Sequence, residues 1–194
     1  MDREARQYWK SRRNQMLKRD RQQRGGFSTN MPVTKILIGL IVLAWLIENF
    51  VPGILAAITG GPVGIAVSLI LSALSPGSLL GLLFTGVFLW IIGSQLESLT
   101  LWWQYVLIFF VSGIVGALLS LVLGAGLVGG TFASFGLAGA YVMAMASRRV
   151  GGVAQWAIVL LAINVILSGF QAGVLGGMLG AFFAGLIIAR AARI

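Results

Sequence analysis

Apolar residues occur in long runs along this chain, and short stretches that hold most of the charges and prolines separate the runs. About 20 consecutive apolar residues are needed for a helix to cross the hydrocarbon core of a bilayer. Six runs come near that length, and we expect each to form a membrane-spanning helix. The sequence therefore predicts an all-α polytopic membrane protein built as a six-transmembrane-helix bundle. The expected spans are residues 33–52, 77–97, 101–124, 131–147, 153–169 and 171–190.

Residues 53–76 are also apolar, but glycines and prolines interrupt them. The run between Pro62 and Pro76 is too short to span a bilayer comfortably. We expect an outer loop that lies at the membrane interface or is partly sunken into it, and a re-entrant hairpin is the alternative. The chain is then a tail at residues 1–30 followed by one transmembrane domain at residues 31–194.

Basic residues support the count of six spans. The chain has 14 Lys and Arg, and nine of the 14 lie in the first 24 positions. If the chain crosses the membrane six times and its N-terminus is cytoplasmic, all 14 basic residues lie in the cytoplasm, where Lys and Arg are enriched. We therefore expect both termini to be cytoplasmic, and the compact core suggests a bacterial plasma membrane. The basic residues outside the first 24 are Lys35, Arg148, Arg149, Arg190 and Arg193.

The tail at residues 1–30 is polar and basic. Its first part is either an amphipathic helix that lies on anionic lipid headgroups or a solvated segment that only sets the topology. Because the charge is confined to a segment beside a membrane domain, it indicates contact with lipid and not with nucleic acid. The candidate contacts to headgroups or to a partner protein are Arg12, Arg13, Lys18 and Arg19.

Missing residue types exclude several kinds of chemistry. The chain contains no cysteine and no histidine. It therefore has no disulfide, no thiolate, no metal or haem site built on these residues, and no histidine base. We expect neither a metal nor a cofactor. Charge inside the spans is sparse and no inverted repeat is clear, which argues against a transporter or channel.

Small residues mark the helix surfaces that we expect to pack closely. Lipid offers membrane helices no hydrophobic drive to associate, so close contacts between small residues hold them together. The candidate packing residues are Gly113 and Gly116 in the third span, Gly136 and Gly139 in the fourth, and Gly176 and Gly180 in the sixth.

The second span, GLLFTGVFLWIIGSQLE at residues 81–97, resembles the second membrane helix of the rhomboid family. GGTFASFGLAGA at residues 129–140 is similar to the start of that family's fourth helix, and GVLGGMLG at residues 173–180 is similar to its sixth. The order and spacing agree over residues 33–190. The resemblance implies a rhomboid-like bundle that admits transmembrane segments of other proteins from the side.

Active rhomboids use a serine on the fourth helix, which a histidine on the sixth helix activates by taking its proton. The resemblance puts Thr131 at the serine position and Gly173 at the histidine position. Thr85 and Gly81 stand where the family has the asparagine and histidine that help to stabilise the oxyanion. No lysine follows Lys35, and arginine stays protonated. We therefore expect a catalytically inactive member of the family, a pseudoprotease.

Three hypotheses of function follow. In the first, the chain binds transmembrane partners or clients without cutting them, and replacement of histidine by glycine enlarges the groove for an apolar guest. In the second, the chain is a structural or accessory subunit of a larger membrane complex. The third, a rhomboid serine endopeptidase as the family suggests, conflicts with the missing residues. The candidate groove residues are Thr85, Thr131, Ser134, Gly173 and Gly177.

Three polar residues have ordinary structural explanations. Ser134 lies one helical turn after Thr131, where we expect a small packing residue or a hydroxyl bonded to the preceding turn. Glu48 and Glu97 both fall at predicted helix ends. We expect these carboxylates to bond nearby backbone amides, since no second acid lies near either of them to form a proton relay.

Overall fold

The computed structural model divides the chain into two compact units, Met1–Asn30 and Met31–Ile194. The structure describes residues 31–51, 64–125, 130–148 and 171–194, together with the isolated positions 53, 155, 159 and 162. The four basic tail residues predicted to contact lipid, Arg12, Arg13, Lys18 and Arg19, lie outside this part.

All regular elements of the described part are helical. Four segments are long and apolar enough to cross a membrane, namely α2, the continuous run from α5 to α6, α7 and α10, while α8 is shorter. The predicted fifth span, 153–169, lies outside the described residues apart from three isolated helical positions. In chain order the elements are α2 (Pro32–Phe50), α4 (Gly64–Leu74), α5 (Leu79–Phe88), the π-helical turn η2 (Leu89–Gly93), α6 (Ser94–Glu97), α7 (Trp102–Val122), α8 (Gly130–Ser147) and α10 (Ala172–Ala191).

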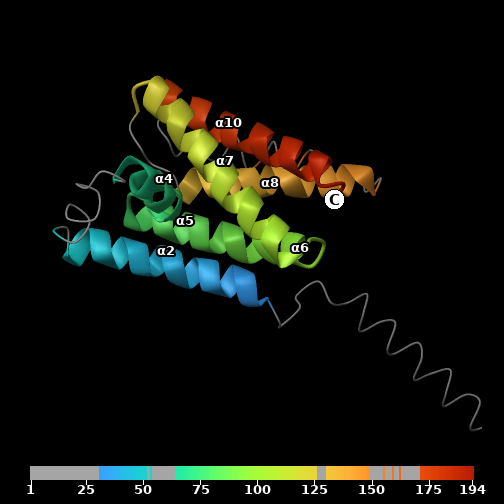
Figure 1. Ribbon diagram of the computed structural model, residues 1–194, viewed down its shortest axis with the longest axis horizontal. Coiled ribbons are helices and arrows are strands. Elements are labelled where there is room, and N and C mark those ends of the chain that lie inside the picture. Colours follow the sequence, from blue (N-terminus) through green and yellow to red (C-terminus); the bar gives the residue numbers. More distant parts are fainter. Residues whose placement is uncertain are drawn as a thin grey trace, which may run out of the picture. The chain divides into compact units, whose positions relative to one another are not determined.

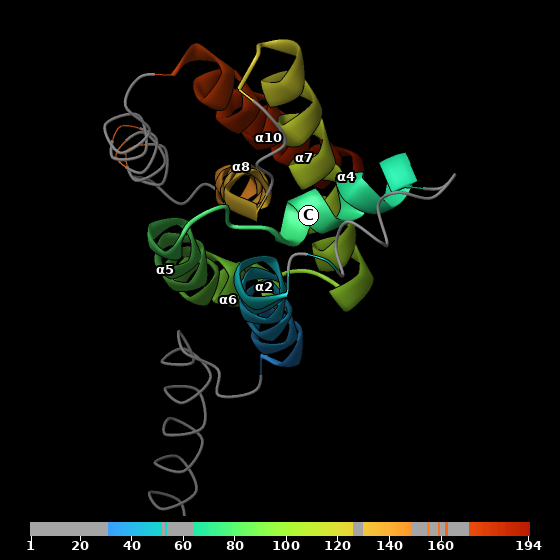
Figure 2. The same cartoon turned by 90° about the vertical axis from the view of Figure 1, so that its left-hand side faces the viewer.

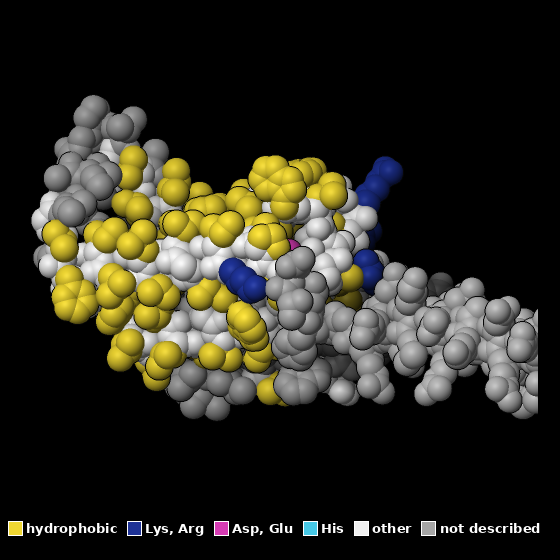
Figure 3. Space-filling model, turned by 90° about the horizontal axis from the view of Figure 1, so that it is seen from below, with side chains coloured by type: hydrophobic (Ala, Val, Ile, Leu, Met, Phe, Trp, Pro, Cys, Tyr) yellow, Lys and Arg dark blue, Asp and Glu magenta, His cyan; other side chains and the backbone are white. Residues whose placement is uncertain are grey.

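Helices α7, α8 and α10 form the most closely packed part of the bundle (Figure 1). α5 lies beside α8, and α2 lies beside α5 on the side away from α10 (Figure 2). Hydrophobic side chains cover much of the described surface seen in Figure 3, as contact with lipid requires. The predicted class, an all-helical membrane bundle, is confirmed.

Part of the predicted outer loop is a helix. Within residues 53–76, α4 runs from Gly64 to Leu74 and contacts α2, α7 and α8. Ala73 is fully buried, and a Cβ atom added to Gly113 of α7 would lie 3.0 Å from the Ala73 Cβ. The segment contains no proline to interrupt a helix, and packing against α7 stabilises a helix that would be marginal alone. The hairpin alternative depends on residues 54–63, which lie outside the described part.

A carboxylate joins the start of α2 to the end of the second span. Glu97 accepts hydrogen bonds from the backbone amides of Val33 and Thr34, both at 2.9 Å, and from the Thr34 hydroxyl at 2.6 Å. Amides in the first turn of a helix have no partner inside it, and they form the positive end of its dipole. The prediction that Glu97 bonds backbone amides is therefore confirmed.

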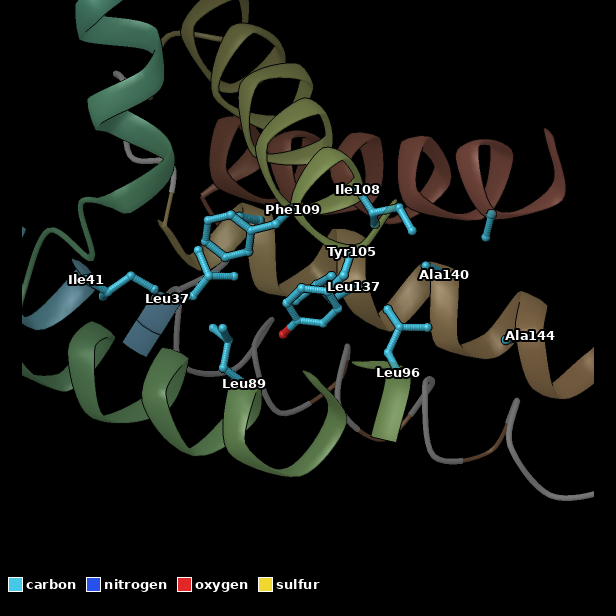
Figure 4. Packing of buried hydrophobic residues seen from close by; sticks show 12 residues of the cluster. Leu37, Ile41, Leu89, Leu96, Tyr105, Ile108, Phe109, Leu137, Ala140 and Ala144 are labelled. Atoms are coloured by element: carbon cyan, nitrogen blue, oxygen red, sulfur yellow. The ribbon is translucent and has the colours of Figure 1, made fainter. Parts of the chain in front are cut away.

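Tyr105 of α7 joins this polar cluster. Its side chain is fully buried, and its hydroxyl hydrogen-bonds with the hydroxyl of Thr34 at 3.2 Å. The Tyr105 hydroxyl fits here because residue 93 in η2 is glycine, and a Cβ atom on Gly93 would overlap the Tyr105 oxygen. Figure 4 shows Tyr105 extending from α7 toward Leu89 of η2, with Leu137 of α8 beside it. One side chain thus connects the first three spans.

Glycines bring α7, α8 and α10 into backbone contact. A Cβ atom on Gly116 of α7 would lie 2.8 Å from the carbonyl oxygen of Gly177 on α10, and one on Gly177 would lie 2.7 Å from that of Gly116. On α8, a Cβ atom on Gly136 would overlap Ser112 of α7, and one on Gly139 would overlap the backbone of α10. The other predicted packing residues, Gly113, Gly176 and Gly180, also lie at helix contacts.

We expect Gly93→Ala to lower the free energy of unfolding by about 1–3 kcal/mol, because the new methyl group would displace the Tyr105 hydroxyl. Without that hydroxyl, the nearest ring atom is Cζ at 3.5 Å, an ordinary van der Waals distance. Tyr105→Phe should therefore recover part of the loss in the double variant. Thermal unfolding of the four proteins in detergent measures this coupling, and simple additivity of the two losses would contradict it.

We expect Gly177→Ala to destabilise the protein by about 1–3 kcal/mol, because its Cβ would lie 2.7 Å from both the Gly116 carbonyl oxygen and the Phe132 ring. Gly86→Ala is the matched control, since no atom outside its own helix lies within 4 Å of the added Cβ. Alanine is favoured over glycine inside a helix by about 1 kcal/mol, so the control should be neutral or stabilising. Equal melting temperatures for the two variants would show that the contact does not matter.

Candidate functional site

The positions that correspond to a rhomboid active site come from three helices. Thr85 lies on α5, Thr131 and Ser134 lie on α8, and Gly173 and Gly177 lie on α10. α8 contacts both α5 and α10, so it brings the three sets together. The side chain of Thr131 is outside the described part of the structure. The geometry of the site is therefore described from Thr85, Ser134, Gly173 and Gly177.

Apolar side chains surround these positions. A buried core cluster contains Phe132 and Phe135 of α8 and Met178 of α10. Phe84 of α5 and Val174 of α10 are partly buried and pack against that cluster. We call these five residues the groove cluster, because they lie around the predicted groove positions.

Thr85 carries a buried hydroxyl at the edge of the groove cluster. Its side chain is fully buried, and its Oγ1 has no hydrogen-bond partner in the described structure. The aromatic rings of Phe84 and Phe88 lie 5.6 Å apart on the same helix, and Phe88 lies 5.6 Å from Phe135 of α8. A buried hydroxyl that is left unpaired costs about 1–3 kcal/mol, so this position favours any partner that supplies a bonding group.

Ser134 is fully buried on α8 and lies between residues of the hydrophobic core. Hydroxyls and glycines occupy all the candidate positions, and neither type acts as a base near neutral pH. Among the described residues, no three His, Cys, Asp or Glu lie close enough together to hold a metal ion. The candidate positions are therefore hydroxyls and glycines that are buried among apolar side chains.

The glycine at position 173 does not open the groove. A Cβ atom there would overlap the Cβ of Ala125, and it would lie 3.0 Å from the Ala125 nitrogen and 3.1 Å from the Leu123 carbonyl oxygen. Gly177 is also covered, by Gly116 and by the ring of Phe132. The expectation that loss of a side chain enlarges the groove is not met, because the C-terminal turn of α7 takes up the space.

The space beside Gly81 is filled in a similar way by the turn before α5. The hydroxyl oxygen of Ser78 caps that helix and accepts a hydrogen bond from the Gly81 amide at 3.0 Å. A Cβ atom on Gly81 would overlap the carbonyl oxygen of Pro76. Both positions at which the resemblance expects a histidine are thus occupied by the backbone or Cβ of a neighbouring turn.

The turn that covers Gly173 is an ordered helix end that the sequence analysis did not assign. Gly124 has a φ angle of +82°, and its amide bonds the carbonyl oxygen of Leu121 at 3.0 Å. The amide of Ala125 bonds the carbonyl oxygen of Ser120 at 2.9 Å. These two bonds around a left-handed glycine form a Schellman motif. A glycine that follows an apolar helix signals such an end, but it does not reveal what the turn contacts.

Comparison with known protein families gives one match. A family model described as the Rhomboid domain matches residues 66–192, which is more than half of the chain and includes every candidate groove position. No curated protein and no solved structure matches the chain. This match shows that the chain belongs to the rhomboid family.

Proposed function

We propose that this rhomboid-family chain binds transmembrane segments of other membrane proteins and does not cleave them. The observation that carries the proposal is the absence of histidine from the sequence, with Gly173 at the position of the family's base and Ala125 packed against it. A serine or threonine hydroxyl is a poor nucleophile near neutral pH unless a base takes its proton. Thr131 therefore has no means of activation in this proposal.

Other cationic side chains in the described structure do not replace the missing base. Arg148, Arg190 and Arg193 lie at the ends of α8 and α10, and arginine stays protonated. Lys35 lies in the first turn of α2, which is bonded to Glu97. Thr85 precedes Glu97 by 12 residues, which is more than three helical turns and about 18 Å along the helix.

The arrangement of basic residues also supports an orientation in the membrane. α8 and α10 end together, where the hydroxyl of Ser147 donates to the carbonyl oxygen of Ile194 at 3.3 Å. Near this end Tyr141 of α8 donates to Gln95 of α6 at 2.5 Å, and α6 in turn holds the start of α2 with Lys35. The described basic side chains thus gather at one end, which we assign to the cytoplasm.

The groove cluster is the surface that we assign to a partner helix. In this proposal α5 moves aside from α8 to admit the partner helix. Displacing it would expose the rings of Phe84 and Phe88 together with the unpaired hydroxyl of Thr85. An apolar helix with one free carbonyl or hydroxyl fits such a surface, because a polar group inside a membrane must find a partner within protein.

Purification from the native membrane after gentle solubilisation tests the proposal, with the amount of each copurifying protein determined. We expect several membrane proteins at substoichiometric levels, since a client binder releases its clients. One partner at a constant ratio would identify the chain as a fixed subunit of a membrane complex instead. Cleavage of a co-expressed transmembrane substrate that disappears in Thr131→Ala would contradict the absence of proteolysis.

Photocrosslinking tests the location of the partner. We expect a photoreactive phenylalanine analogue in place of Phe84 to form adducts with transmembrane segments, because Phe84 is a partly buried member of the groove cluster. The matched control is the same analogue in place of Phe183 on α10, whose side chain is 56% exposed. Adducts from both positions in equal yield, or from neither, would remove the groove from the proposal.

A further inference from the structure

One face of α10 carries a row of exposed apolar side chains that leads to an arginine. Leu179, Phe183 and Ile187 are 46%, 56% and 63% exposed, and they follow one another at intervals of four residues. We call these three residues the α10 stripe. Arg190, which is also exposed, comes three residues after Ile187 in the last turn of the helix. Residues three and four apart share a face of a helix, so Arg190 lies at the end of the stripe.

Two further arginines lie close to Arg190. The amide of Arg193 donates to the carbonyl oxygen of Arg190 at 3.2 Å. Arg148 follows Ser147 of α8, whose hydroxyl donates to the carbonyl oxygen of Ile194 at 3.3 Å. The joined ends of α8 and α10 therefore carry three exposed arginines. Figure 3 shows basic side chains projecting at the end of the described part where α8 and α10 end in Figure 1.

The backbone at Arg193 has a conformation that favours glycine. Its φ angle is +54°, in the left-handed region that side chains with a Cβ atom rarely adopt. The amide of Ile194 donates to the carbonyl oxygen of Ala189 at 3.1 Å, so Arg193 takes the glycine position of a Schellman motif. An unfavourable backbone conformation that a fold retains points to a function of its side chain. Here the side chain adds a third positive charge to the group.

These three charges have no negative partner within the described residues. The described part has two acidic side chains, Glu48 near the opposite end of α2 and Glu97, whose oxygens accept hydrogen bonds from α2. The guanidinium groups of the three arginines form no ion pair with them. Arginine keeps its charge and forms paired hydrogen bonds with phosphate oxygens. At the end of a membrane helix, the phosphate of a lipid headgroup is the anion within reach.

We propose that an anionic phospholipid binds at the joined ends of α8 and α10. Its phosphate lies at Arg148, Arg190 and Arg193, and an acyl chain runs along the α10 stripe. The three positive charges favour a headgroup with net negative charge over a zwitterionic one, whose own cation they repel. This site takes a lipid and not a protein, so it goes beyond the proposed function and does not depend on it.

Binding of two lipids to the purified full chain tests the site. Native mass spectrometry in detergent measures how much phosphatidylglycerol and how much phosphatidylcholine each variant retains. We expect the unmodified chain to prefer phosphatidylglycerol, and Arg190→Gln/Arg193→Gln to bind it roughly fivefold more weakly for each arginine removed. The matched control is Arg12→Gln/Arg13→Gln, which lowers the net charge equally. An equal loss in the two double variants would mean that the preference follows net charge alone, and would overturn the site.

Arg193→Gly separates lipid binding from a role in ending the helix. Glycine adopts the left-handed conformation without a steric cost. In nanodiscs of phosphatidylcholine alone, the melting temperature of this variant should therefore equal or exceed that of the unmodified chain. Its binding of phosphatidylglycerol should nevertheless weaken roughly fivefold. Unchanged binding would mean that Arg193 does not contact the lipid, and the proposed set of phosphate ligands would be wrong.

A photoreactive lipid tests the position of the acyl chain. In phosphatidylcholine nanodiscs, phosphatidylglycerol with a diazirine in its acyl chain should label the α10 stripe more than Leu83 and Val87 of α5, which are also exposed. α5 is the matched control, because the span that it begins ends at Glu97 without an arginine. Arg190→Gln/Arg193→Gln should remove the excess on α10 and leave the labelling of α5 unchanged. Equal labelling of the two helices in the unmodified chain would show that the stripe contacts bulk lipid only, and would overturn the proposal.

Discussion

The arrangement of the first three spans depends on the hydrogen bonds that the carboxylate of Glu97 accepts. It accepts hydrogen bonds from two amides at the start of α2 and from the Thr34 hydroxyl. The Thr34 hydroxyl also hydrogen-bonds with the hydroxyl of Tyr105 on α7. Amides in the first turn of a helix have no partner inside it and form the positive end of its dipole, so such a carboxylate holds the helix end in place. Gly93 in the π-helical turn leaves room for the Tyr105 hydroxyl. The backbone of the second span therefore also fixes the position of Tyr105.

The two ends of the bundle are held by different forces. The end at which α8 and α10 end together is joined by hydrogen bonds that Glu97 accepts and Tyr141 donates. Toward the opposite end, α10 is held by the packing of glycines against leucine tips and a turn of α7. The two buried hydroxyls without partners in the described structure, on Thr85 and Ser120, both lie in this opposite half.

Hydrophobic run length was enough to find most of the helices. The described spans begin and end within two residues of the predicted ones, because the thickness of the bilayer requires long apolar runs whatever their neighbours are. The role of Glu97 was also predictable, since a carboxylate at a helix end has few other ways to be satisfied. The helix within residues 64–74 was missed because a short apolar run is helical only when a neighbour such as α7 covers it.

The sequence by itself determined that the chain lies in a membrane, that histidine chemistry is absent, and which positions lack a side chain. It did not determine what occupies the space at those positions. A glycine shows that a close approach is possible, but Ala125 and Leu123 reach Gly173 and Gly176 only because the Gly124 turn bends back over α10. That approach joins residues far apart in the chain, so it depends on how α7 and α10 cross. Only the tertiary structure could therefore decide whether the space at these positions is open or filled.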